Sequence, residues 1–194
     1  MTFPIYLTFF RILLSPLFPV FYLGYESLGI SVVWVPYILL FILILSESTD
    51  LFDGWLARRH NQVTNFGKII DPMADTIARI TVVFTFTQGV VNLPMLIAFT
   101  FLYREFFIGA LRTLCALQGV ALAARKSGKI KAILQAVMAI VVVLFLIPYV
   151  YGWLSLITLQ RISLFLFSIG AIYTVLSGID YIFINKDYIK KALL

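Results

Sequence analysis

The 194-residue sequence has few charged residues and almost none of the side chains that bind zinc or form disulfides. Only 12% of its residues are charged, about half the fraction found in a typical soluble domain. Its single cysteine, Cys115, excludes an internal disulfide and a cysteine-rich metal centre. Its single histidine, His60, argues against zinc chemistry based on histidine. These absences point away from a soluble metalloprotein and from a disulfide-stabilised one.

Apolar residues dominate what is present. The chain is 62% hydrophobic and has a mean hydropathy of +1.02. Long apolar runs recur along its whole length, which is typical of an integral membrane protein. No stretch has the composition of a soluble domain, so we predict a single membrane domain over residues 1–194. The first apolar run lacks the basic start and cleavage site of a signal peptide, and we interpret it as a retained helix.

Six segments approach or exceed the ~20 residues that are needed to cross hydrocarbon. They predict an all-α fold of six transmembrane helices, separated by short connections rich in Gly, Pro and polar residues. The predicted segments are Ile5–Leu23, Val32–Arg59, Gly67–Gln88, Leu93–Leu117, Ile130–Val150 and Leu159–Phe183. An even number of crossings places both termini on the same side of the membrane.

Lysine and arginine are unevenly divided between the two sides of this predicted bundle. Ten basic residues lie in or beside the second-to-third loop, the fourth-to-fifth loop and the C-terminal tail, whereas the three opposite hairpins contain none. We therefore predict that both termini face the cytoplasm. The net charge of +6 favours contact with anionic lipid and does not require a nucleic-acid partner.

Four aspartates stand at helical spacing where the second and third predicted helices meet the cytoplasm. Asp50 and Asp53 are three residues apart and Asp71 and Asp75 are four apart, so each pair lies on one face of its helix. A helix rises about 1.5 Å per residue. Counted from the hairpin along each helix, Asp53 lies at about the same depth as Asp71, and Asp50 at about the same depth as Asp75. The four carboxylates can therefore converge in one site on the cytoplasmic side of these two helices.

Such a concentration of negative charge requires compensation at the edge of a membrane. Two divalent cations would cancel four negative charges, and hard oxygen ligands favour Mg²⁺ or Mn²⁺. Paired ions of this kind can hold a phosphoryl group during displacement. Gly54, Ala57 and Gly67 leave room beside the acidic face, and Arg58 offers a planar fork for phosphate oxygens.

Two other interpretations of the acidic cluster compete with a metal site. The aspartates could form a buried ion network with Arg58 and Arg59, or they could line the path of a proton or cation transporter. Four carboxylates at paired helical spacing, with glycines between them, favour a ligand site over a structural network. Transporters usually contain internal repeats or helices broken near the midplane, whereas these acids lie at one edge.

The stretch DLFDGWLAR at residues 50–58, followed at fixed spacings by Gly67, Asp71 and Asp75, resembles the full signature of the CDP-alcohol phosphotransferases. All eight fixed positions of that signature match. The resemblance implies a six-helix enzyme of a bacterial inner or plasma membrane, a homodimer, with a two-metal site that opens to the cytosol. It implies phosphoryl transfer, in which an alcohol attacks a CDP-activated lipid and CMP leaves.

The resemblance also implies a role for each residue of the signature. Four carboxylates would bind the two Mg²⁺ or Mn²⁺ ions: Asp50, Asp53, Asp71 and Asp75. Asp75 would also be the catalytic general base. The CDP group would be bound by Asp50, Gly54, Ala57, Arg58 and Gly67.

Further stretches resemble the phosphatidylglycerophosphate synthase branch of this family, which transfers a phosphatidyl group from CDP-diacylglycerol to sn-glycerol 3-phosphate. These stretches are LTFFRILLSPLF, RRHNQVTNFGKIIDPMAD, YREFFIGALR, SGKIK and TVLSGIDYIF. Two positions depart from that branch, because Thr76 replaces a lysine after the last aspartate and Ala132 replaces a threonine after SGKIK. Arg79, one turn beyond Asp75, is a candidate for supplying the lost positive charge.

A phosphorylated acceptor needs cations of its own. We predict that four basic side chains of the fourth and fifth helices bind the acceptor phosphate: Arg104, Arg112, Lys129 and Lys131. The alternative for the two lysines is anchoring at the cytoplasmic surface, and the alternative for Arg104 is an ion pair with Glu105. Family members that act on inositol phosphate, phosphatidylglycerol or serine share the signature, so these acceptors are the alternatives to glycerol 3-phosphate.

Overall fold

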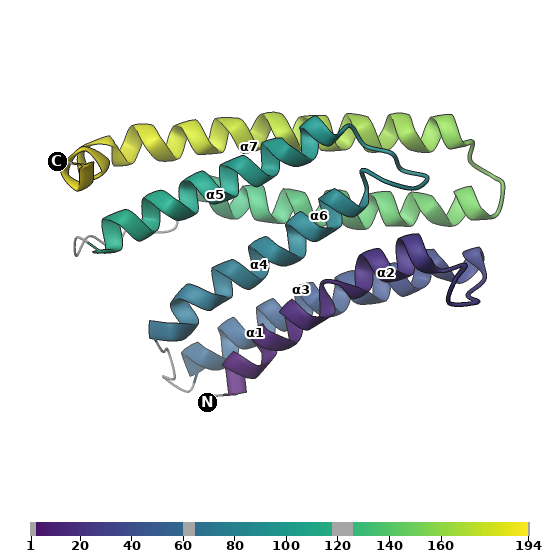
Figure 1. Cartoon of the computed structure of the whole chain (residues 1–194), viewed down its shortest axis with the longest axis horizontal. Helices are drawn as coiled ribbons and strands as arrows, with labels where there is room; N and C mark the ends of the chain where they lie inside the picture. The colour runs from purple at the N-terminus through teal and green to yellow at the C-terminus, as the bar shows by residue number, and fades with distance from the viewer. Residues whose placement is uncertain (1–2, 60–64, 118–125, 194) are drawn as a thin grey trace.

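The protein is an all-helical bundle whose helices run back and forth along one axis (Figure 1). The structure is a computed structural model. It describes the backbone of residues 3–59, 65–117 and 126–193 and the side chains of residues 6–49, 70–115, 126–186 and 188–190. Its elements are α1 (Phe3–Leu14), α2 (Leu17–Gly24), the short 3₁₀ helix η1 (Val32–Trp34), α3 (Val35–Arg59), α4 (Asn65–Thr85), α5 (Met95–Leu117), α6 (Lys126–Val150) and α7 (Leu156–Leu193). The predicted all-α class is confirmed for these residues.

The helices form two groups that pack side by side. In the first group, α1 and α2 pack against both α3 and α4. In the second group, α7 packs against both α5 and α6. Contacts of α3 with α6, and of α4 with α5 and α6, join the groups. The first and last helices begin and end toward the same end of the bundle (Figure 1), as the sequence predicted.

The predicted first helix, Ile5–Leu23, is divided into α1 and α2 at Ser15 and Pro16. Proline has no N–H to donate, so the hydrogen bonds of α1 do not continue through Pro16. The chain turns there instead, with the Phe18 amide donating to the Ser15 carbonyl at 3.2 Å. Pro19 lies in the first turn of α2, where its missing N–H is tolerated. The two short helices together make the first pass along the bundle.

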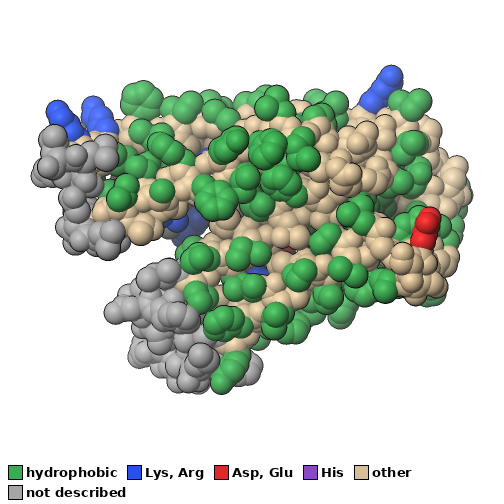
Figure 2. Space-filling view, in the orientation of Figure 1, with side chains coloured by type: hydrophobic (Ala, Val, Ile, Leu, Met, Phe, Trp, Pro, Cys, Tyr) green, Lys and Arg blue, Asp and Glu red, His purple; other side chains and the backbone are tan. Residues whose placement is uncertain are grey.

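Four stretches of the described chain are long and apolar enough to cross a membrane. They are Tyr6–Gly24, Val32–Thr49, Lys126–Val150 and Leu156–Lys186. Helix α5 is not among them, because Arg104, Glu105 and Arg112 lower its hydropathy. The side chains of α4 are described only over residues 70–85, which is too short a stretch to span a membrane. Apolar side chains cover much of the outer surface (Figure 2), as contact with lipid requires. Six crossings remain a prediction.

Buried phenylalanines connect the two helix groups. Phe86, just after α4, packs edge to face against Phe18 of α2 and Phe167 of α7, with ring centroids 5.6 and 5.9 Å apart. Phe167 makes a further edge-to-face contact with Phe101 of α5 at 6.2 Å. Each such pair adds about 1 kcal/mol beyond the burial of its area. This aromatic chain fixes the two groups relative to each other and so positions the polar residues between them.

Candidate active site

Asp71 and Asp75 lie on the face of α4 that packs against α1. The Thr8 hydroxyl donates a hydrogen bond of 2.7 Å to Oδ1 of Asp71, and the Arg11 guanidinium pairs with Oδ1 of Asp75. Thr8 and Arg11 are one turn apart on α1, as the aspartates are on α4, and the two helices run in the same direction (Figure 1). The two polar pairs therefore match along the helix contact.

Arg11 is the most deeply buried charged residue of this contact. It is only 1% exposed, whereas the side chain of Asp75 keeps a quarter of its surface exposed. A buried guanidinium without a carboxylate would be strongly destabilising, and Asp75 supplies that carboxylate. Sequence analysis did not predict this pair. The sequence feature that could have indicated it is Arg11, an arginine inside an apolar run, one turn after Thr8.

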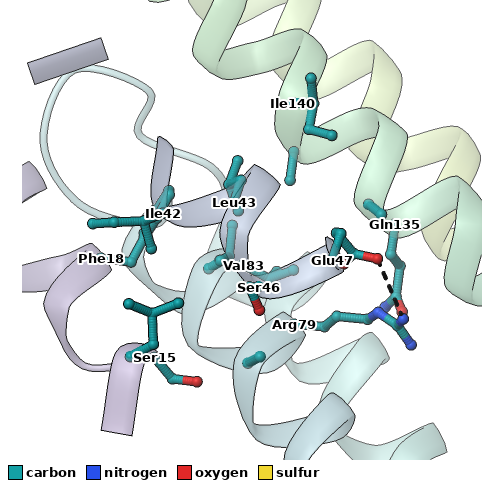
Figure 3. Close-up of a pocket in the computed structure, with 15 residues that line it drawn as sticks. Ser15, Phe18, Ile42, Leu43, Ser46, Glu47, Arg79, Val83, Gln135 and Ile140 are labelled. Carbon is teal, nitrogen blue, oxygen red and sulfur yellow. Dashed lines mark ion pairs between the residues drawn. The ribbon is translucent and has the colours of Figure 1, made fainter. Parts of the chain in front are cut away.

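A second ion pair joins α4 to α3 one turn farther from the hairpin. Arg79 of α4 approaches Glu47 of α3 at 3.9 Å, and Gln135 of α6 lies beside them (Figure 3). Arg79 follows Asp75 by four residues, and Glu47 precedes Asp50 by three. This contact therefore sets α3 and α4 at a common level one turn away from the signature.

The other residues of the signature lie where the structure describes no side chains. Asp50, Asp53, Gly54, Ala57 and Arg58 belong to the last turns of α3, and Gly67 belongs to the first turn of α4. Their predicted convergence with Asp71 and Asp75, and their predicted contacts with CDP, are outside the described side chains. These assignments stay predictions.

The donor chemistry of Asp71 and Asp75 fits a hard divalent cation. Both carboxylates are partly exposed rather than sealed in the core, and carboxylate oxygens are the ligands that Mg²⁺ and Mn²⁺ prefer. Taken alone, the side chains that the structure describes do not bring together three or more metal-ligating groups. A complete site would need the carboxylates of α3 as well.

Arg104, Glu105 and Lys131 form a buried charge cluster between α5 and α6. Glu105 pairs with Lys131 and with Nη1 of Arg104 at 3.2 Å. The other terminal nitrogen of Arg104 donates to the Ser177 hydroxyl of α7 at 2.9 Å. The ion pair between Arg104 and Glu105, which the sequence offered as an alternative, is therefore present.

The other two predicted phosphate ligands do not join this cluster through a described contact. Arg112 lies over the ring of Tyr181, 5.4 Å from its centroid, and donates from Nε to the tyrosine hydroxyl at 3.3 Å. Lys129 is exposed, as its alternative role as a surface anchor requires. Burial thus separates Arg104 and Lys131 from Lys129.

A largely apolar groove lies between α1, α2, α3, α4 and α6, with the Glu47–Arg79 pair at one end. Leu14, Phe18, Leu43, Val83 and Ile140 line its apolar part, and the residues around the Glu47–Arg79 pair line its polar end (Figure 3). On the outside, the molecule is hollowed between the two helix groups at the end where the termini lie, and Lys or Arg side chains are visible inside (Figure 2). Charged groups and an apolar groove therefore adjoin one another in this bundle.

Comparison with known proteins gives this arrangement its context. The family described as CDP-alcohol phosphatidyltransferase matches residues 1–176. The chain belongs to the CDP-alcohol phosphatidyltransferase family. It is 35% identical over 186 residues to the CDP-diacylglycerol–glycerol-3-phosphate 3-phosphatidyltransferase of Escherichia coli (strain K12), with 92% of each chain covered. The proteins of the same name from Shigella flexneri and Salmonella typhi are 35% and 34% identical over the same share of each chain.

Membership of the CDP-alcohol phosphatidyltransferase family separates an enzyme from a transporter. The resemblance drawn from the signature is confirmed, and the protein is an enzyme of this class. A transporter is thereby set aside. Among the described side chains Asp75 pairs with Arg11, whereas any pairing with Arg58 or Arg59 lies outside the described side chains.

Proposed function

We propose that this phosphatidyltransferase transfers a phosphatidyl group from CDP-diacylglycerol to sn-glycerol 3-phosphate, giving phosphatidylglycerol phosphate and CMP. The observation that carries the proposal is that relatives named for this reaction match 92% of this chain. The intact signature supports it. A bond forms between the acceptor hydroxyl oxygen and the lipid-side phosphorus, and the bond from that phosphorus to CMP breaks. The hydroxyl proton passes to a carboxylate of the enzyme.

We assign two divalent cations to Asp50, Asp53, Asp71 and Asp75. The Glu47–Arg79 contact supports this assignment, because it sets α3 and α4 level one turn away from Asp50 and Asp75. When bound, such ions would neutralise the diphosphate and the charge on the departing CMP. Thr8 and Arg11 orient the two carboxylates of α4 from behind, so that their open sides face the substrate.

Asp75 is our choice for the base that takes the acceptor proton, and Arg11 fixes its carboxylate in one orientation. Gly54, Ala57, Arg58 and Gly67 are proposed to bind the CDP group with Asp50. The groove that ends at the Glu47–Arg79 pair suits an acyl chain of the lipid substrate, because most of its walls are apolar. A lipid could therefore reach the site without leaving an apolar environment.

Arg104 and Lys131 are proposed to bind the phosphate of the acceptor, with Arg112 and Lys129 in supporting positions. The first two are buried and lie on α5 and α6, which face α4 across the join between the helix groups. Arginine and lysine at such a site attract a phosphate dianion strongly, because little water competes with it.

An acceptor panel on purified protein tests the proposed function. CMP release from CDP-diacylglycerol should require Mg²⁺ or Mn²⁺ and should be fastest with sn-glycerol 3-phosphate, with the product lipid identified by mass spectrometry. Release with inositol phosphate, phosphatidylglycerol or serine instead would keep the chemistry and change the acceptor. Release that survives complete chelation of divalent ions would refute the metal assignment.

Six crossings, cytoplasmic termini and a homodimer complete the proposal. The single cysteine, Cys115, is buried, so a Cys115→Ala background allows new cysteines to report on sidedness. In inside-out vesicles a membrane-impermeant maleimide should label Lys129→Cys and not Trp153→Cys, and in intact cells the pattern should reverse. Cross-linking in lipid nanodiscs would measure the number of subunits.

A further inference from the structure

The cluster of Arg104, Glu105 and Lys131 is buried, and its charges do not balance. Their side chains are 9%, 13% and 6% exposed, respectively. Both oxygens of Glu105 accept from Nη1 of Arg104, at 3.2 and 3.4 Å, and one of them also accepts from Lys131. One carboxylate thus serves two cations in surroundings where water screens charge poorly.

Arg79 brings a third cation to the same region. Arg79 and Arg104 each repel Lys131 electrostatically. The contact of Arg79 with Glu47 is long, at 3.9 Å. Arg104 and Lys131 thus share one carboxylate, and Arg79 adds positive charge nearby, which favours the arrival of an anion.

The Nε–H group of Arg104 is an independent sign that a ligand is missing. It is buried and finds no hydrogen-bond acceptor among the side chains and backbone that the structure describes. The two terminal nitrogens of the same guanidinium bind Glu105 and Ser177. Buried donors are almost always paired. A hydrogen-bond acceptor from outside the described chain would therefore satisfy the Nε–H of Arg104.

Glu105 contacts both Arg104 and Lys131, so an anion that bound these two cations would compete with its carboxylate. We propose that Glu105 is a specificity-determining counter-ion that neutralises Arg104 and Lys131 until the phosphate of the acceptor replaces it. This inference rests on the proposed function, because it presumes that the acceptor phosphate binds at these cations. A phosphate dianion can replace the carboxylate, whereas an uncharged alcohol such as glycerol cannot.

Binding of inorganic phosphate and of sn-glycerol 3-phosphate, without CDP-diacylglycerol, tests the exchange directly. Glu105→Gln keeps the size of the side chain and removes its charge, so the dissociation constant of each anion should fall about tenfold. Glu26→Gln is the matched control, because Glu26 is exposed and contacts only the hydroxyl of its neighbour Tyr25 through a described hydrogen bond. Its anion binding should equal that of the unaltered protein.

Thermal unfolding gives a second measurement that needs no turnover. Glu105→Gln should lower the Tm in the absence of anions, because two buried cations lose their partner. Phosphate should then raise the Tm of this variant far more than the Tm of the unaltered protein. A variant whose Tm responds to phosphate no more than the unaltered protein does would overturn the proposal.

Kinetics separate an exchanging counter-ion from a purely structural carboxylate. The product lipid keeps the acceptor phosphate, so tighter phosphate binding in Glu105→Gln should lower both the KM for glycerol 3-phosphate and kcat. Loss of kcat with an unchanged KM would indicate a structural role and contradict the proposal. Activity with glycerol should not improve.

Glu105→Asp provides a second variant if the glutamine variant fails to fold. It keeps the charge but shortens the side chain, so contact with Lys131 weakens and anion affinity should rise about threefold. Unchanged or weaker anion binding would count against the exchange, even if CMP release with glycerol 3-phosphate is normal. Absence of that CMP release in the unaltered protein would instead refute the proposed function.

Discussion

The acidic and basic sites of this bundle are neutralised in opposite ways. On α4, the carboxylate of Asp75 keeps a quarter of its surface exposed while its partner Arg11 is buried behind it. Between α5 and α6, both cations and the carboxylate of Glu105 are buried together, and Glu105 contacts both cations. The first carboxylate therefore keeps an exposed side, whereas the second site encloses its counter-ion.

This difference indicates what each counter-ion does when a ligand binds. Under the proposed function, a cation would bind the exposed side of Asp75, and Arg11 could stay in place. Glu105 would have to give up its contacts with Arg104 and Lys131, because the anion would bind the same two side chains. The first arrangement orients a ligand group permanently, whereas the second selects for a ligand with enough charge to displace the protein's own acid.

The largest effect is expected from Asp71→Asn. Its amide oxygen can still accept the Thr8 hydrogen bond, so the Tm should change little. Loss of one metal-binding carboxylate should lower kcat on the order of 10³-fold or more. CMP release and thermal unfolding would be measured together, with Glu26→Gln as the control. A variant that retains its activity would remove Asp71 from the metal site.

A large effect on stability is expected from Arg11→Gln. Removing one partner of a buried ion pair costs about 3 kcal/mol, so the Tm should fall clearly. Mg²⁺ should restore part of the loss, because it supplies positive charge to Asp75. Arg11→Lys keeps the charge and should lose less.

An Arg11→Gln variant that is as stable as the unaltered protein would show that the pair contributes nothing. The contrast between the two sites would then rest on Glu105 alone.

A moderate effect should distinguish the two predicted lysines. Lys131 is buried against Glu105, and Lys129 is exposed. Lys131→Gln should raise the KM for glycerol 3-phosphate about tenfold or more, whereas Lys129→Gln should change it less than about twofold, because water screens an exposed charge. Equal changes would mean that burial does not decide which cation binds the acceptor.

The smallest effect is expected from Thr8→Val. The side chain of Thr8 is fully buried, and its hydroxyl bonds Asp71 at 2.7 Å. Loss of this hydrogen bond should cost about 1 kcal/mol of stability and lower kcat severalfold, whereas Thr8→Ser should preserve both. A Thr8→Val enzyme with unchanged kcat would show that Asp71 needs no support from α1.

Spacing along the chain predicted the local features of this protein well. Apolar runs located the helices, and four stretches of the described chain are long and apolar enough to cross a membrane. The four-residue spacing of Asp71 and Asp75 correctly placed both on one face of α4. The division of the first helix was missed, although Pro16 and Pro19 were visible, because its apolar run continues through them.

Contacts between distant residues could not be predicted in the same way. Arg11 and Asp75 are 64 positions apart, and no periodicity relates them. Arg104 and Lys131 are buried, whereas Lys129 is exposed. This difference in burial depends on how α5, α6 and α7 pack.

The amino-acid sequence by itself determined the class of fold and the family, because periodicity and a fixed-spacing signature are local properties of the chain. The tertiary structure decided which charges meet. Electrostatic pairing depends on distance and on exclusion of water, and both are set only when helices far apart in sequence pack together.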